Sequence, residues 1–156
     1  MNYRHLLAAC LAAVTLSSCH SDDDGPASRT PVYLLEGTDA RPTTWEAPDY
    51  SLFELTMSVQ VQLGDTLASL QSTQDLMCAT INGDVRAVTG SKTTMGEVYF
   101  PLTIAGNGGE KTVTLMYYCD RLHRIYTLTN WTNFNASAAP TGESGLYRPC
   151  FTSIFQ

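Results

Sequence analysis

The chain has 156 residues, of which only 15% are charged, and its formal net charge is −6. That length suffices for one domain of ordinary size. The turn-rich, β-leaning composition argues against a disordered chain. The acidic balance argues against a nucleic-acid binder, which needs Lys and Arg concentrated on one face. Most of the negative charge lies in the N-terminal part of the chain. Residues 20–49 contain seven acids and two arginines, whereas the chain from residue 50 onward contains eight acids and six bases.

Residues 1–18 have the pattern of a secretory signal peptide. Arg4 supplies a positive charge, and the apolar run LLAACLAAVTL follows, eleven residues that are too few to span a bilayer. The next residues, LSSC, resemble the lipobox of bacterial lipoproteins, whose cysteine receives fatty acyl chains such as palmitate and begins the mature chain. We therefore expect lipidation of Cys19, with each buried methylene contributing about 0.8 kcal/mol. The alternative is a plain secretory signal that contains a cysteine.

A short acidic cluster, HSDDD, follows the cysteine directly. Asp22, Asp23 and Asp24 resemble the surface-export signal of Bacteroidota lipoproteins, which implies an outer-membrane protein that faces the cell exterior. The alternative is a solvated acidic tether without an address function. Either way, the N-terminus predicts a protein outside the cytoplasm.

Residues 19–44 read as an extended tether, because Pro26, Pro31 and Pro42 are spread through a polar, acidic stretch. Within it, VYLL at residues 32–35 is either a first strand or a segment that docks on a partner's sheet edge. Residues 45–156 are expected to form the folded domain.

Apolar and polar residues alternate with period two through that domain, in segments such as TMSVQVQL, EVYFPLTI and KTVTLMYYC. Asn82-Gly83 is a strong hairpin signal between two apolar arms. Pro101 indicates a sheet edge or a bulge. A last strand is expected near PCFTSIF, residues 149–155. The spacing predicts an all-β fold, an antiparallel, immunoglobulin-like β-sandwich of six to eight strands.

The order of MSVQVQL, DLMCATINGDVRAV, VYFPLTIAGNGGEKTVTLMYYCD and YTLTNWTNF, then Gly145 and Pro149, resembles the small β-sandwich domain of Bacteroidota surface lipoproteins. The resemblance covers about residues 50–156. Thr80 and Ala87 depart from it, standing where that family usually has Phe and Gly. It implies the sandwich fold and a place near glycan- or peptide-uptake systems or among adhesin-like proteins.

Three cysteines remain after the leader and Cys19: Cys78, Cys119 and Cys150. Their spacing shows no zinc pattern, and they are either small buried hydrophobes or include one disulfide. Cys119 with Cys150 is the first pair to test, because Cys119 ends one predicted late strand and Cys150 begins another.

Catalytic signatures are not evident in the sequence. His123 stands in a predicted turn, and neither a metal site nor a Ser/His/Asp triad can be assembled around it. Asp75, Asp84 and Asp120 lie at strand ends or turns, where Asp serves local backbone hydrogen bonding. We expect a protein that is not an enzyme and that uses neither a metal nor a cofactor.

Two features remain as candidates for recognition. Arg86 follows the hairpin and either pairs with Asp84 or Asp75 or contacts a ligand. Strand parity predicts an exposed apolar patch, unless Trp131 instead caps the core from its loop. The residues of this predicted patch are Met116, Tyr118, Ile125 and Trp131.

Together these features predict a non-enzymatic accessory subunit of an outer-membrane TonB-dependent nutrient-uptake complex. Its expected partners are a transporter with its lipoprotein partner and a glycan or peptide ligand. The alternative is an adhesin or structural surface subunit that binds host or matrix ligands.

Overall fold

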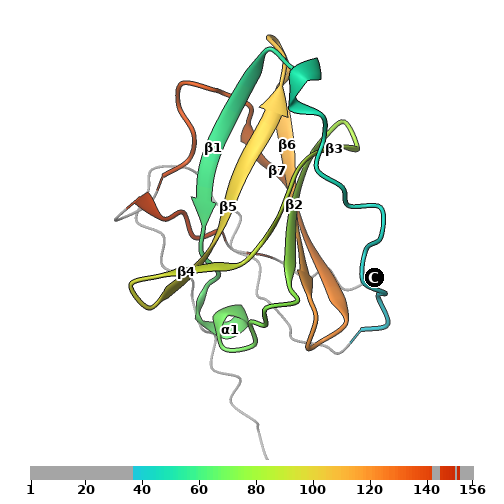
Figure 1. Ribbon diagram of the computed structural model, residues 1–156, viewed down its shortest axis with the longest axis vertical. Helices are drawn as coiled ribbons and strands as arrows, with labels where there is room; N and C mark the ends of the chain where they lie inside the picture. Colours follow the sequence, from blue (N-terminus) through green and yellow to red (C-terminus); the bar gives the residue numbers. More distant parts are fainter. Residues whose placement is uncertain (1–36, 142–144, 150, 152–156) are drawn as a thin grey trace, which may run out of the picture.

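The computed structural model describes residues 37–141, 145–149 and 151, which form two packed antiparallel sheets (Figure 1). One sheet has the strand order β1-β5-β4, and the other has the order β3-β2-β6-β7. These seven strands confirm the predicted all-β sandwich. The elements in chain order are η1 (Tyr50–Leu52), β1 (Leu55–Val61), α1 (Asp65–Ala68), β2 (Leu76–Ile81), β3 (Asp84–Gly90), β4 (Lys92–Thr94), β5 (Glu97–Gly106), β6 (Thr112–Cys119) and β7 (Arg124–Asn133).

The core follows the alternation seen in the sequence, since every second residue of a half-buried strand points to the same face. Tyr117 lies at its centre. Its ring packs edge-on against Phe100, with ring centroids 5.8 Å apart, and also contacts Tyr126 and Phe151 at 6.2 and 5.9 Å. Burying each large apolar side chain contributes about 1.5–3 kcal/mol. The other fully buried large side chains include Met57, Val61, Met77, Ile81, Leu102, Ile104 and Leu115.

The β2–β3 hairpin turns at Asn82 and Gly83, whose φ values are 54° and 88°. Two successive left-handed residues make the turn whose twist matches that of the flanking strands. The turn therefore keeps β2 and β3 in one sheet.

Strand β5 changes partners along its length. It pairs with β4 over residues 97–99 and with β1 over residues 100–106, so no position has a neighbour on both sides. Pro101, opposite Gln60, thus lies where β5 has one hydrogen-bonded neighbour. A missing N–H is tolerated there, which confirms the predicted edge position.

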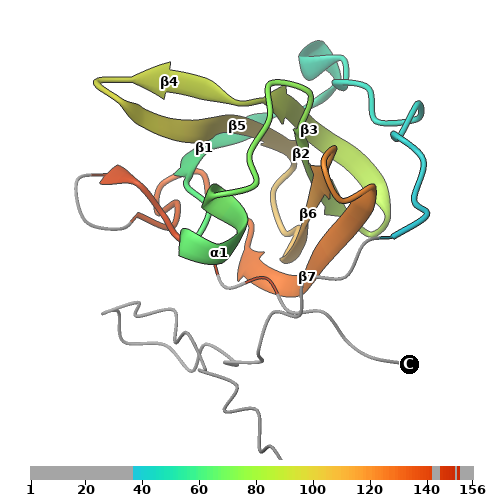
Figure 2. The same ribbon diagram turned by 90° about the horizontal axis from the view of Figure 1, so that it is seen from below.

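Residues 37–49, which we call the strap, run along the outer side of the four-stranded sheet (Figure 2). The Gly37 and Asp39 N–H groups donate to the carbonyls of Leu122 and His123 in the β6–β7 turn, at 2.8 and 2.9 Å. The Asp39 carboxylate accepts from the Ile125 N–H at 2.8 Å. Residues 37–44 were expected in the tether, and in the structure they are bonded to the sandwich.

A second segment lies along the edge of β1. The Gln62 N–H donates to the Tyr147 carbonyl and the Tyr147 N–H donates to the Gln60 carbonyl, both at 2.8 Å. Arg148 Nε adds a 2.6 Å hydrogen bond to the Gln62 side chain. These contacts cover part of the β1 edge. Most of the last strand predicted over residues 149–155 lies outside the described residues.

Candidate functional site

The apolar patch predicted on the outer face of β6 and β7 is not present in that form. Tyr118 is only 1% exposed. Met116, Ile125 and Trp131 are half-buried. The four side chains therefore do not make the open aromatic surface that strand parity suggested.

The strap explains the burial of Tyr118. It is bonded to β7 through Asp39 and then reaches the start of β2, where the Arg41 guanidinium donates to the Gln74 carbonyl. Strand β6 lies between β7 and β2 in the sheet, so the strap crosses the end of β6 that carries Tyr118. Burial raises the pKa of the Tyr118 phenol. The prediction that Tyr118 is exposed is therefore wrong, because a segment assigned to the tether covers this side chain.

Trp131 lies in an irregular part of β7. Residues Leu128 to Thr132 of β7 stand opposite only Leu115 to Val113 of β6, and Asn130 within this stretch has φ 52°. The extra residues redirect the chain. Trp131 packs against the core, with its ring centroid 5.8 Å from that of Tyr147. The core-capping alternative is the one that the structure supports.

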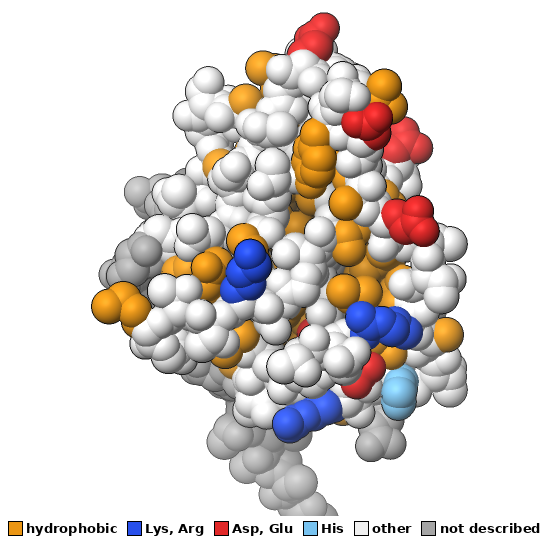
Figure 3. All heavy atoms as spheres, in the orientation of Figure 1, with side chains coloured by type: hydrophobic (Ala, Val, Ile, Leu, Met, Phe, Trp, Pro, Cys, Tyr) orange, Lys and Arg blue, Asp and Glu red, His pale blue; other side chains and the backbone are white. Residues whose placement is uncertain are grey.

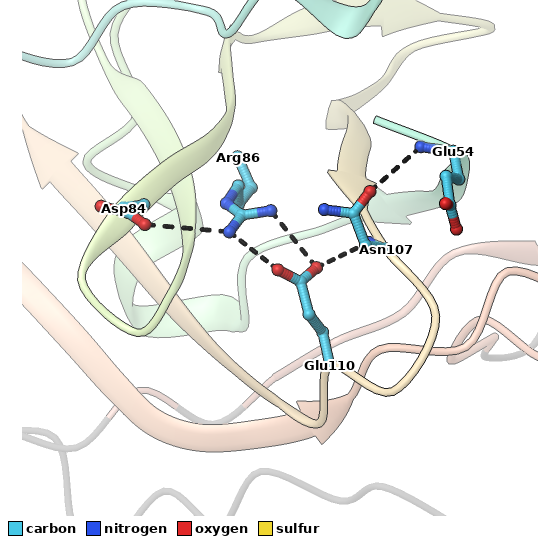
Figure 4. Close-up of polar contacts among 5 residues, drawn as sticks. All are labelled: Glu54, Asp84, Arg86, Asn107 and Glu110. Atoms are coloured by element: carbon cyan, nitrogen blue, oxygen red, sulfur yellow. Dashed lines mark hydrogen bonds and ion pairs between the residues drawn. The ribbon is translucent and has the colours of Figure 1, made fainter. Parts of the chain in front are cut away.

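Arg86 belongs to the polar cluster that Figure 4 draws. Ala79 pairs with Ala87 and Thr80 pairs with Val85, which leaves Arg86 as the extra residue of a β-bulge. A bulge re-aims the side chain that it carries. The Arg86 side chain is 8% exposed.

Glu110, on the β5–β6 turn, is the partner of Arg86. Its two carboxylate oxygens accept from the two terminal nitrogens of the guanidinium at 2.8 and 3.2 Å, a bidentate arrangement. Asp84 is 3.8 Å away and its side chain is 78% exposed, so it adds little. The Phe53 ring covers the guanidinium, with its centroid 4.7 Å from the Arg86 central carbon. The predicted pairing with Asp84 is therefore secondary, and pairing with Asp75 is absent.

Further contacts fix Glu110 in place. Its Oε2 atom accepts from the Asn107 N–H at 2.7 Å, and the Asn107 side chain accepts from the Glu54 N–H at 3.2 Å (Figure 4). A Cβ atom added at Gly106 would lie 2.8 Å from Glu110 Oε2, closer than real Cβ contacts come. The cluster thus joins β3, the β5–β6 turn and the chain that enters β1. Apart from Arg86 Nε, which is buried without a partner among the described residues, the polar groups of the Arg86–Glu110 pair are used within the protein, which makes Arg86 a structural residue in this geometry.

Asp75 is the second buried charge. It is completely buried, and its carboxylate accepts from the Ser72 N–H, the Asp120 N–H and the Tyr117 hydroxyl at 2.9, 2.9 and 2.7 Å. Burial, followed by the bond to Asp75, raises the pKa of the Tyr117 phenol well above its ordinary value. Asp75 thus serves local hydrogen bonding as the sequence indicated, and it also ties the start of β2 to β6.

The other predicted groups are dispersed. His123 is exposed in the β6–β7 turn with φ 47°. Cys78 and Cys119 are both buried and form no disulfide with each other, and burial raises the pKa of Cys78 to about 12. Within the described part of the chain, no three His, Cys, Asp or Glu side chains gather as metal ligands would. Cys150, and with it the predicted Cys119–Cys150 disulfide, lies outside the described residues, as do Cys19 and the acids at positions 22–24.

The exposed apolar side chains lie elsewhere, in a place that strand alternation did not predict. Tyr50, Leu52 and Leu55 are 39%, 72% and 42% exposed, and Met95 on the β4–β5 turn is 99% exposed. The first three fall within six residues of one another, around η1. The stretch YSLFEL could have signalled this, because its apolar residues do not follow the period-two alternation of a half-buried strand.

The fold and these sites define an all-β protein with a two-sheet sandwich and a buried arginine–glutamate pair. No family model matches the chain, and neither a curated protein nor a solved structure matches it. None of the helices in the described residues is long and apolar enough to cross a membrane.

Proposed function

We propose that the protein is a cell-surface lipoprotein, anchored in the outer membrane through Cys19, that serves as an accessory subunit of a TonB-dependent nutrient-uptake complex. The observation that carries this proposal is the succession of an apolar run, LSSC and three aspartates over residues 6–24. A lipid anchor followed by an acidic stretch accounts for both the cysteine position and the uneven charge. The resemblance of residues 50–156 to surface-lipoprotein domains supplies the link to nutrient uptake.

The arrangement of the sandwich is compatible with such an anchor. The strap begins at Gly37 beside the β6–β7 turn, while η1 lies at the opposite end of the molecule (Figure 1). The eighteen residue steps from Cys19 to Gly37 span at most about 65 Å when fully extended. An anchored chain would keep the sandwich near the membrane, with its η1 end free to point outward.

Purification from detergent-solubilised outer membranes tests the proposal. The full chain with a C-terminal affinity tag is compared with the Cys19→Ala variant, which keeps the domain and loses the acylated residue. We expect the lipidated chain to bring a TonB-dependent transporter with it and the variant to be absent from the membrane fraction. Recovery of the lipidated chain as a free monomer would contradict the accessory role. Binding of host or matrix ligands by that monomer would favour the adhesin alternative.

A further inference from the structure

Exposed apolar and acidic side chains gather at the η1 end of the sandwich, which we call the acidic pole. Its apolar part is Tyr50, Leu52 and Leu55. Exposed apolar side chains that cluster within a short segment are candidates for a contact site. Three of the four large hydrophobic residues that are exposed in the described chain lie here.

Several contacts anchor the segment that carries the apolar side chains of the pole. Asp49 caps η1 by accepting from the Ser51 N–H at 3.0 Å, and the Tyr50 hydroxyl donates to the Thr103 carbonyl of β5 at 3.0 Å. Directly after η1, the Phe53 ring is fixed against the Arg86 guanidinium. Leu52 is therefore presented from a turn that is attached on both sides. Such preorganisation lowers the entropic cost of association.

Exposed acids flank this apolar part in the sequence, and another lies beside Arg86, which packs on Phe53. Asp49, Glu54 and Asp84 are exposed, and Glu54 is joined to the β5–β6 turn through Asn107. The charge of Arg86 is balanced by Glu110, which leaves Lys111 as the exposed base of that turn. On the face that Figure 3 shows, acidic side chains lie mainly toward the upper end and edge, whereas Lys and Arg lie in the lower half.

We propose that the acidic pole is a docking surface for a partner protein whose contact surface is apolar at its centre and ringed by Lys and Arg. Charge complementarity selects this occupant. A two-fold contact between copies of this chain would bring acidic pole against acidic pole. An anionic lipid surface would repel the same acids. The orientation of the pole away from the membrane rests on the proposed function, whereas the chemistry of the pole does not.

Site-specific photocrosslinking in cells that make the full chain tests the docking surface. The crosslinking residue is placed by Leu52→p-benzoylphenylalanine or Leu55→p-benzoylphenylalanine, with Thr93→p-benzoylphenylalanine as the control on the exposed β4 strand. We expect one defined adduct at positions 52 and 55 and none at position 93. The crosslinked peptide of the partner should be apolar and flanked by Lys or Arg.

Two charge variants of the position-52 crosslinker separate specific from general effects. Glu54→Gln with Asp84→Asn removes two acids from the pole. Thr73→Lys with Thr93→Lys changes the net charge equally at exposed positions outside the pole. Loss of two ion pairs of about 0.5 kcal/mol each lowers the adduct yield about fivefold. The control pair should leave the yield unchanged.

Three outcomes would overturn the docking surface: no adduct, an adduct between two copies of this chain, or a partner peptide rich in acids. Location is read separately, by labelling the same cells with an impermeant amine reagent. A labelled, surface-exposed chain without an adduct refutes the docking surface and leaves the proposed function standing. An adduct formed by a chain that is not labelled from outside refutes the proposed location and leaves the docking surface standing.

Discussion

Replacement of Arg86 by methionine provides the sharpest test of the buried cluster. Arg86→Met keeps an unbranched side chain against Phe53 and removes the guanidinium that neutralises Glu110. The Glu110 side chain is 16% exposed and retains the Asn107 N–H donor. Removing one partner of a fully buried pair costs about 3–5 kcal/mol. Because Glu110 remains partly exposed to solvent and keeps one hydrogen-bond donor, we expect the free energy of unfolding to fall by an amount at the lower end of this range, about 3 kcal/mol.

That loss is large against the 5–15 kcal/mol that stabilises an ordinary domain. At roughly 4 °C per kcal/mol, the midpoint of thermal unfolding should fall by about 12 °C. The assay is urea unfolding, followed by tryptophan fluorescence, of the chain made without its leader and with Cys19→Ser. Glu110→Gln added to Arg86→Met should recover at least about 1 kcal/mol, because the double variant buries no unpaired charge.

Asp84→Ala is the matched control, since it removes the exposed acid at 3.8 Å from the same guanidinium. We expect a change within about 0.5 kcal/mol. If Arg86→Met were as mild as this control, the structural account of Arg86 would be wrong. That result would favour the alternative interpretation, in which Arg86 contacts a ligand.

Three further substitutions or treatments follow from the same geometry. Gly106→Ala places a methyl group 2.6 Å from the Phe134 ring. Urea unfolding should show a free energy of unfolding lower by about 1–3 kcal/mol, and no decrease would show that the backbone around Gly106 relaxes freely. Asp75→Ala leaves three donors without their acceptor and should lower the free energy of unfolding by about 3 kcal/mol or more. Adding Tyr117→Phe should recover part of that loss, and simple additivity of the two changes would refute the hydrogen bond between Tyr117 and Asp75. The Cys78 thiol, with its pKa raised to about 12, should resist iodoacetamide at pH 8 until urea unfolds the chain; mass spectrometry of the alkylated peptide would reveal any early reaction.

Period-two alternation carried most of the fold prediction. It placed Met57, Val59 and Val61 on the core face of β1, and all three are buried. Asn82-Gly83 located the hairpin because only a few residue types adopt two left-handed positions in succession. These signals are local, so a sequence displays them directly.

The contacts that decide the site are not local. The part of the strap that buries Tyr118, residues 37–41, lies about eighty positions earlier in the chain. The partner of Arg86 is Glu110, twenty-four residues away, and a bulge turns the arginine toward it. Alternation cannot reveal a bulge, since inserting residues into a strand changes the face on which later side chains lie. For the same reason Trp131 packs toward the core although parity placed it outside.

The most direct test of the central claim is labelling of intact cells with a membrane-impermeant amine reagent, followed by mass spectrometry of the chain recovered from the outer-membrane fraction. Exposed Lys92 and Lys111 are the reporters on the sandwich. The surface-lipoprotein account predicts that both lysines are labelled and that the mature chain begins with an acylated Cys19. An unacylated N-terminus, or lysines that are labelled only after the cells are broken, would contradict it.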